Sequence, residues 1–281
     1  ISCYFKHFII FFLLFYNSYG HSQDNVPELD IEITEGVIEP IPIAFPDFIT
    51  DNFSSSIKAN EISKIIQNDL LKTSLFRVIP KGSYISELTS IDAPVQFSDW
   101  RTINTDLLVT GNVSVINELI TIKFRLWDVV AQNQIFEGVQ FQGHSRNIRR
   151  IAHKVSDLIY NGVTGEGKYF DSRIAFISES GPKNNRTKRL AIMDQDGANL
   201  MFLTDSESIV LAPRFSPDSR KILYTSYETG KPRVYLMNLT NGNLRSFPEL
   251  PGMTFAPRFS PDGKKIILSI TDNGNTDIYT L

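Results

Sequence analysis

Apolar and polar positions follow two different periods in the first half of this 281-residue chain. Residues 57–71 and 147–161 place apolar side chains three and four positions apart, which predicts two amphipathic helices with one face turned inward. Residues 29–34 instead alternate apolar and polar side chains, as a half-buried strand does. Helices and strands mixed in this way indicate an N-terminal α/β domain of ordinary size, placed at residues 29–163.

Further strands are expected around the first helix. Residues 41–48 contain Pro42 and Pro46, and proline lacks the N–H that a central strand donates, so a sheet edge is predicted here. A buried strand is expected at residues 107–111. Two more segments are predicted to pair as an antiparallel hairpin, residues 119–129 and 134–142.

A repeated phrase dominates the second half of the chain. Ala-Pro-Arg-Phe-Ser-Pro-Asp occupies residues 212–218 and recurs at residues 256–262, a spacing of 44 residues (256 minus 212). A period of about 40–45 residues is typical of propeller blades. Each phrase ends in a Ser-Pro-Asp turn, and an apolar run follows at residues 221–226 and 265–270, which predicts a buried strand.

The repeats predict a partial all-β propeller over residues 173–281. An earlier unit at residues 173–204 has the later strands of a blade but no copy of the phrase, so it is expected to lack its innermost strand. About two and a half blades are then present, and a propeller needs at least four to close its ring. The sequence is therefore expected to be a C-terminally truncated fragment with exposed strand edges.

Residues 1–20 have the three parts of a secretory signal peptide. Lys6 precedes the apolar run at residues 8–15, and Ser18 and Gly20 supply small residues for cleavage. An N-terminal membrane anchor is the alternative; after cleavage, no direct membrane insertion is expected. The only cysteine lies within this segment, so the mature chain would need no disulfide. Residues 21–28 are predicted to be a flexible arm, and residues 164–172 a linker into the first blade.

The composition and net charge of the chain argue against one class of partner. The chain is 42% hydrophobic and 21% charged, as soluble globular proteins are, and its formal net charge is −3. Nucleic-acid binding usually requires a basic field, so no nucleic-acid partner is expected.

No catalytic residue, metal site or cofactor is predicted. The chain has no Gly-x-Ser-x-Gly motif of the serine hydrolases. His144 and His153 are isolated in the sequence, and no set of His, Asp and Glu has the spacing of a metal site. Residues 194–197, Asp-Gln-Asp-Gly, resemble the start of a calcium loop, but the closing acid is absent and a hairpin turn explains them better.

Several segments together resemble the TolB family. Residues 29–36 and 42–45 are similar to the start of the mature proteins, residues 164–166 and 169–176 are similar to the junction before the propeller, and the repeats match its blades. The resemblance implies a six-bladed propeller in the periplasm of Gram-negative bacteria, within the Tol–Pal system. It further implies a non-catalytic interaction protein whose propeller mouth binds the lipoprotein Pal and whose arm engages TolA, supporting envelope integrity and cell division.

The resemblance also implies site residues. The arm that would engage TolA carries Asp24, Val26, Glu28, Leu29 and Ile31. The segments before each repeated phrase are the Pal-facing candidates: Ser208, Ile209, Val210, Leu211, Met253, Thr254 and Phe255. Two residues of the phrase itself are expected to line the central channel, Arg214 and Arg258.

Structural alternatives accompany each of these roles. Leu211 and Phe255 could instead pack between blades, the two arginines could form salt bridges within the funnel, and the arm could be a leader with no role. At the level of the whole protein, two alternatives stand beside the interaction protein. One is a secreted serine peptidase whose catalytic domain is missing, and the other is a periplasmic propeller that binds a small ligand in its channel.

Overall fold

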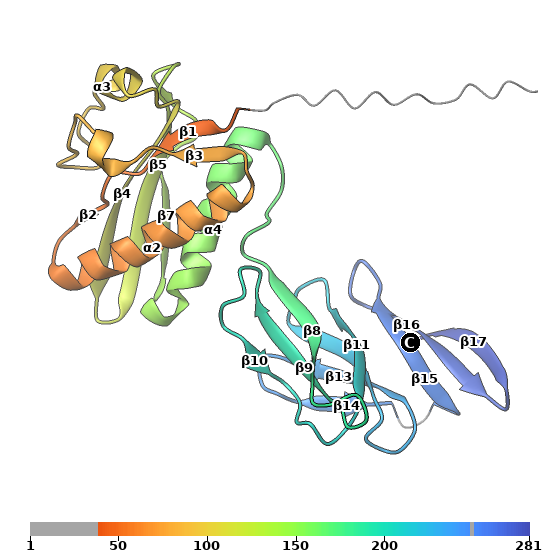
Figure 1. The fold of residues 1–281 in the computed structure, drawn as a ribbon. Helices are drawn as coiled ribbons and strands as arrows, with labels where there is room; N and C mark the ends of the chain where they lie inside the picture. The colour runs from red at the N-terminus through yellow and green to blue at the C-terminus, as the bar shows by residue number, and fades with distance from the viewer. Residues whose placement is uncertain (1–38, 248–249) are drawn as a thin grey trace, which may run out of the picture. The chain divides into compact units, whose positions relative to one another are not determined.

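The computed structural model describes residues 39–247 and 250–281 (Figure 1). The predicted signal peptide, arm and strand at residues 29–34 lie outside this part of the chain. Within it, no helix combines the length and the apolar character needed to cross a membrane.

A mixed seven-stranded sheet organises the first half of the described chain. Its main path runs in the order β3-β1-β4-β5-β6, with β2 paired to β4 and β7 paired to β5. The strands are β1 (Ile41–Ala44), β2 (Ile49–Thr50), β3 (Phe76–Val78), β4 (Leu107–Ile116), β5 (Leu119–Asp128), β6 (Asn133–Gln134) and β7 (Val139–His144). The predicted antiparallel hairpin is present as β5 with β6 and β7, interrupted between the last two.

The predicted edge position of the proline-containing strand is wrong. β1 lies inside the sheet, in parallel register with β3 on one side and β4 on the other. Pro42 is tolerated there because its backbone lies opposite the segment just before the first residue of β4. Its carbonyl accepts a hydrogen bond from the N–H of Asp106 at 2.9 Å, one residue before β4. Pro46 lies beyond the end of β1.

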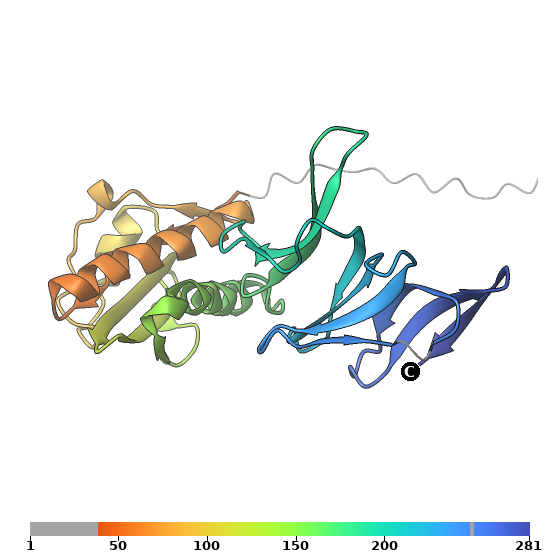
Figure 2. The ribbon, with the colours of Figure 1, turned by 90° about the horizontal axis from the view of Figure 1, so that it is seen from below.

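Two long helices cover one face of the sheet. They are α2 (Phe53–Lys72) and α4 (Ile148–Thr164), which lie side by side in both views (Figures 1 and 2). α2 begins four residues before the predicted start, because the side chain of Asn52 caps it by accepting from the N–H of Ser55 at 2.9 Å. The short elements η1 (Lys81–Ser83), α3 (Phe97–Thr102) and η2 (Ser145–Asn147) carry too little periodicity to be predicted.

Alternation along β4 builds a core on each side of the sheet. Leu107 and Val109 join the larger core with the apolar stripes of α2 and α4. Leu108, between them, joins a smaller core on the other face with Trp100 of α3. Since both faces are buried there, β4 opens with three consecutive apolar residues, 107–109, and this is why its strand character was predictable.

Three antiparallel sheets follow, each corresponding to one blade. The first contains β8 (Arg173–Ser180), β9 (Thr187–Asp194) and β10 (Met201–Phe202). The second contains β11 (Val210–Phe215), β12 (Lys221–Ser226), β13 (Arg233–Asn238) and β14 (Leu244–Ser246), and the third β15 (Met253–Phe259), β16 (Ile266–Asp272) and β17 (Asn275–Thr280). In the described part of the chain the first sheet has three strands, as the missing phrase predicted, and the second has four.

The repeated phrase folds the same way in both copies. Ala212 and Pro213 stand opposite one residue of β12, which makes a β-bulge, and Ala256 and Pro257 do the same opposite β16. Both alanines have positive φ, 52° and 47°. The Ser-Pro-Asp turns are also alike. The Ser216 hydroxyl donates to Asp218 Oδ1 at 2.6 Å and accepts from Lys221 N–H at 2.9 Å, and Ser260 makes the matching pair of bonds at 2.5 and 3.0 Å.

Candidate functional site

The residues predicted to face Pal lie mostly in strands rather than in loops. Val210 and Leu211 open β11, and Met253, Thr254 and Phe255 open β15. Ile209, just before β11, is 48% exposed, whereas Ser208, Leu211, Met253 and Phe255 are half-buried. The prediction that these residues bind a partner stays a prediction for those with accessible side chains.

Two of the Pal-facing residues need correction, because their side chains are interior. Val210 is 2% exposed and packs in a cluster with Leu190 and Ile222 of the neighbouring strands. Thr254 is 1% exposed, and its hydroxyl oxygen accepts a hydrogen bond from the N–H of Val234 in β13 at 2.7 Å. Both side chains hold the blades together in this structure and are not available as contacts for a partner.

The two predicted channel arginines occupy equivalent positions after their bulges and are exposed. Arg214 donates to the carbonyl of the preceding Pro213 at 2.7 Å, and Arg258 is 3.5 Å from that of Pro257. No ion pair involves either arginine among residues 39–247 and 250–281, so the predicted funnel salt bridges are not seen there. The arm residues Asp24, Val26, Glu28, Leu29 and Ile31 lie outside the described residues.

A buried polar cluster lies where α2 and α4 meet the turn after β9. Asp69 of α2 is fully buried and accepts three hydrogen bonds. One comes from the Ser156 hydroxyl at 2.8 Å and one from Gln195 Nε2 at 3.0 Å. The third partner is Nδ1 of His153, 2.7 Å away, whose side chain is 2% exposed. Since Gln195 belongs to the first blade, Asp69 joins both helices to that blade.

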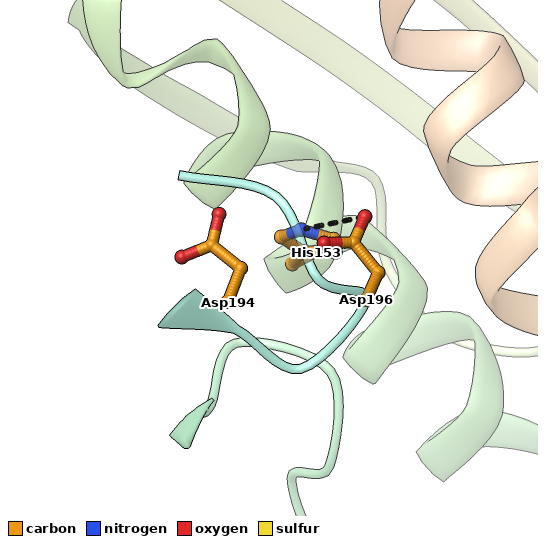
Figure 3. A group of neighbouring side chains, drawn as sticks. All are labelled: His153, Asp194 and Asp196. Atoms are coloured by element: carbon orange, nitrogen blue, oxygen red, sulfur yellow. Dashed lines mark ion pairs between the residues drawn. The ribbon is translucent and has the colours of Figure 1, made fainter. Parts of the chain in front are cut away.

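The other side of the His153 ring faces two carboxylates of the first blade (Figure 3). Nε2 of His153 is 3.9 Å from Oδ2 of Asp196, and Asp194 lies beside them. Arg149, one turn earlier on α4, forms an ion pair with Asp196, and its Nε is 3.6 Å from Oδ2 of Asp194. Burial acts to raise the pKa of Asp196, but hydrogen bonds from Ala198 N–H and Arg149 outweigh it and leave that pKa below its usual value.

A second buried carboxylate holds the predicted linker against α4. Asp157 is 3% exposed, and its Oδ1 accepts from the N–H groups of Tyr169 and Phe170, both at 2.6 Å. Its Oδ2 accepts from the N–H of Asp171 at 3.2 Å. Phe170 is thereby held in the larger core. The segment between α4 and β8 is therefore attached to the helix by its backbone.

These contacts were only partly foreseeable. Asp69 lies on the buried face of α2, within the helix that the apolar pattern predicted. His153 is isolated in the sequence, and no spacing predicted its contact with Asp69. The turn at residues 194–197 is a hairpin turn as predicted, with Gly197 N–H donating to the carbonyl of Asp194 at 2.9 Å. Its acidic residues are nevertheless brought to His153, which lies about 40 residues away in the sequence (194 minus 153 is 41).

The observed architecture is that of an α/β domain followed by the blades of a β-propeller. Two family models match it in this order: the TolB amino-terminal domain over residues 29–135 and the TolB beta propeller domain over residues 160–281. The chain belongs to the TolB family. The fold class predicted from the sequence is thus confirmed.

Named relatives are similar over most of this chain. It is 55% identical over 211 residues to the Tol-Pal system protein TolB of Cereibacter sphaeroides, covering 75% of this chain and 48% of that protein. It is 51% identical over 227 residues to the protein of the same name from Dinoroseobacter shibae, covering 80% and 51%. The chain spans about half the length of the curated relatives it matches.

A solved structure agrees in fold. The crystal structure of TolB from Acinetobacter baumannii superposes with a TM-score of 0.70 at 31% identity, covering 86% of this chain and 58% of that one.

Proposed function

We propose that the protein containing this chain is a non-catalytic periplasmic interaction protein of the Tol–Pal system. It links an inner-membrane Tol component, TolA, to the outer-membrane lipoprotein Pal, and so supports envelope integrity and cell division. The observation that carries the proposal is the 51–55% identity to proteins named Tol-Pal system protein TolB. Export by the signal at residues 1–20 would deliver the protein to the periplasm.

Pal would bind at the mouth of the complete propeller. Ile209 is the best contact candidate of this chain because it is apolar, 48% exposed and directly ahead of β11. Met253 and Phe255, which are half-buried at the start of β15, occupy the corresponding place of the next blade. Apolar side chains at such positions become anchors when a partner covers them.

Calorimetry with the full-length protein and the Pal domain of the same genome tests this contact. Replacing an anchor by alanine weakens binding by about fivefold or more, so Ile209→Ala and Phe255→Ala are expected to do so. Ile116→Ala is the matched control, since Ile116 is 65% exposed on the hairpin between β4 and β5, within the α/β domain. If all three variants bind Pal with the affinity of the wild type, Ile209 and Phe255 do not belong to the interface. If the folded wild type does not bind Pal, Pal is rejected as the partner.

TolA would bind the N-terminal arm by adding a strand to it. Strand addition depends on backbone N–H groups, and alternate side chains give specificity. Val26→Pro removes one N–H and is expected to abolish TolA binding, measured by fluorescence anisotropy, whereas Val26→Ala keeps it. Equal binding by both variants would show that the arm does not act as a strand. If Val26→Pro does not bind TolA, the next side chains to substitute are those of Asp24, Glu28, Leu29 and Ile31.

Family membership favours this interaction protein over the peptidase alternative. The same preparation tests both, because a serine peptidase would be labelled covalently by a fluorophosphonate probe. We expect no labelling of the full-length protein. Labelling at a serine would favour the serine peptidase over the interaction protein.

A further inference from the structure

We propose that His153, Asp194 and Asp196 form a Zn²⁺ site that joins helix α4 to the first propeller blade. The site lies apart from the Pal and TolA contacts proposed above. It adds a bound metal ion to a protein otherwise expected to bind only proteins. One nitrogen and two carboxylates make up the donor set, and these atoms all lie within 4.8 Å of one another (Figure 3).

The orientation of the His153 ring is the first observation behind the site. Its Nδ1 is 2.7 Å from Asp69, an acceptor-only group when ionised, so in the neutral imidazole Nδ1 carries the proton and Nε2 has the free lone pair. Nε2 is buried and has no hydrogen-bond partner among the residues that the structure describes. A histidine held by a carboxylate on one nitrogen, with the other nitrogen free, is the usual arrangement of a zinc ligand.

Charge is the second observation. Asp69, Asp194 and Asp196 bring three negative charges to the cluster, and Arg149 brings one positive charge. With a neutral imidazole the net charge is −2, in a place where His153 is 2% and Asp194 8% exposed. Arg150, the next residue, does not balance it, because its guanidinium is bonded to Asp171 at 3.1 Å. One divalent cation would neutralise the cluster and supply the partner that Nε2 lacks.

The donor types favour zinc over the harder cations. Zn²⁺ accepts imidazole nitrogen together with carboxylate oxygen, and sites with three protein ligands leave a fourth position for water. Ca²⁺ and Mg²⁺ prefer sets of oxygen ligands. Bonds of about 2 Å in a tetrahedral site bring the donors closer than they are here, so binding must draw the turn at residues 194–197 toward α4.

Arg149 is the internal competitor of the metal. Its guanidinium pairs with Asp196 through Oδ2, the oxygen that faces His153, so a zinc ion must displace it. The displacement is feasible because the Arg149 side chain is 26% exposed and its Nε has no hydrogen-bond partner in the described chain. Arg149 therefore lowers the affinity for metal, and removing its charge should raise that affinity.

The test uses the full-length protein freed of metal by a chelator and titrated with Zn²⁺ in a calorimeter. We expect one ion per chain, at least tenfold weaker binding for Asp194→Asn, and tighter binding for Arg149→Gln. Co²⁺ in place of Zn²⁺ should give the visible absorption of a tetrahedral complex, which His153→Gln abolishes. His144→Gln is the matched control, because His144 is a part-exposed histidine paired with Glu118 elsewhere in the α/β domain.

Arg149→Gln makes the test robust, since a gain in affinity cannot arise from misfolding. Absence of Zn²⁺ heat and of Co²⁺ absorption in both the wild type and Arg149→Gln would overturn the proposal, leaving a cluster held by Arg149 and the histidine alone. Loss of binding in His144→Gln but not in His153→Gln would overturn it as well, by moving the ion to the surface.

Discussion

The hydroxyl oxygen of Thr254 in β15 accepts a hydrogen bond of 2.7 Å from the N–H of Val234 in β13, so the third blade is bonded to the second at a buried position. The backbone adds a second bond, from Thr254 N–H to the carbonyl of Pro232 at 3.1 Å. Adjacent blades are thus joined by a specific polar contact in addition to apolar packing.

Thr254→Val is expected to destabilise the protein because it leaves the buried N–H of Val234 without an acceptor. The expected loss is about 1–3 kcal/mol of unfolding free energy, measured by denaturant unfolding of the full-length protein. Thr254→Ser keeps the hydroxyl and should lose less. Equal losses in the two variants would mean that the methyl group, and not the hydrogen bond, joins the blades.

The Ser-Pro-Asp turns offer a pair of exchange variants. Ser219 has φ 56°, while the equivalent residue of the next blade is Gly263 with φ 70°. The left-handed region costs a non-glycine residue roughly 1 kcal/mol, so Ser219→Gly should be neutral or raise the melting temperature. Gly263→Ser should lower it by placing a side chain in the same conformation. Changes of the same sign in both variants would contradict this account.

The linker should depend on Asp157. Asp157→Asn replaces an acceptor by an amide N–H₂ facing the backbone N–H groups of residues 169–171, so we expect a loss of about 1–3 kcal/mol. Faster proteolytic cleavage between α4 and β8 should accompany it. Asp92→Asn is the control, because Asp92 is an exposed partner of Arg125 and such pairs are worth about 1 kcal/mol or less. Unchanged cleavage of Asp157→Asn would contradict the role of this carboxylate.

The aspartates of the two Ser-Pro-Asp turns predict how the stability of the protein depends on pH. Hydrogen bonds from the Ser216 hydroxyl and Arg220 N–H lower the pKa of Asp218, and those from the Ser260 hydroxyl and Lys264 N–H lower the pKa of Asp262. A lowered folded-state pKa contributes stability above the unfolded value of 3.8, and this contribution is lost as pH falls through the folded-state pKa.

The double variant Asp218→Asn/Asp262→Asn should therefore unfold at lower denaturant than wild type at neutral pH. The difference should shrink as the pH falls below about 4. A difference that is constant across this range would assign the effect to something other than these carboxylates.

The repeat in the sequence was sufficient to predict the blades because each blade is a local unit. The turn, the bulge and the strands of one blade all lie within about 45 residues, and two copies of Ala-Pro-Arg-Phe-Ser-Pro-Asp fold alike. The two long helices were equally predictable, since their apolar stripes reflect burial against one sheet. The short strand β3 and the interior position of β1 depend on pairing with distant segments, and α3 depends on packing against the sheet, so these features were missed or wrong.

The sequence by itself therefore determined the α/β domain and the partial propeller, because periodicity and repeated phrases record local burial. The family was indicated by the resemblance of several segments to TolB proteins. Only the tertiary structure decided which polar residues meet. Asp69, His153 and Asp196 come from three separate segments, and no spacing links them, since their approach is produced by the packing of α2 on α4 and of both on the turn after β9. For the same reason Val210 and Thr254 became interior residues, because neighbouring blades cover side chains that a single repeat would leave exposed.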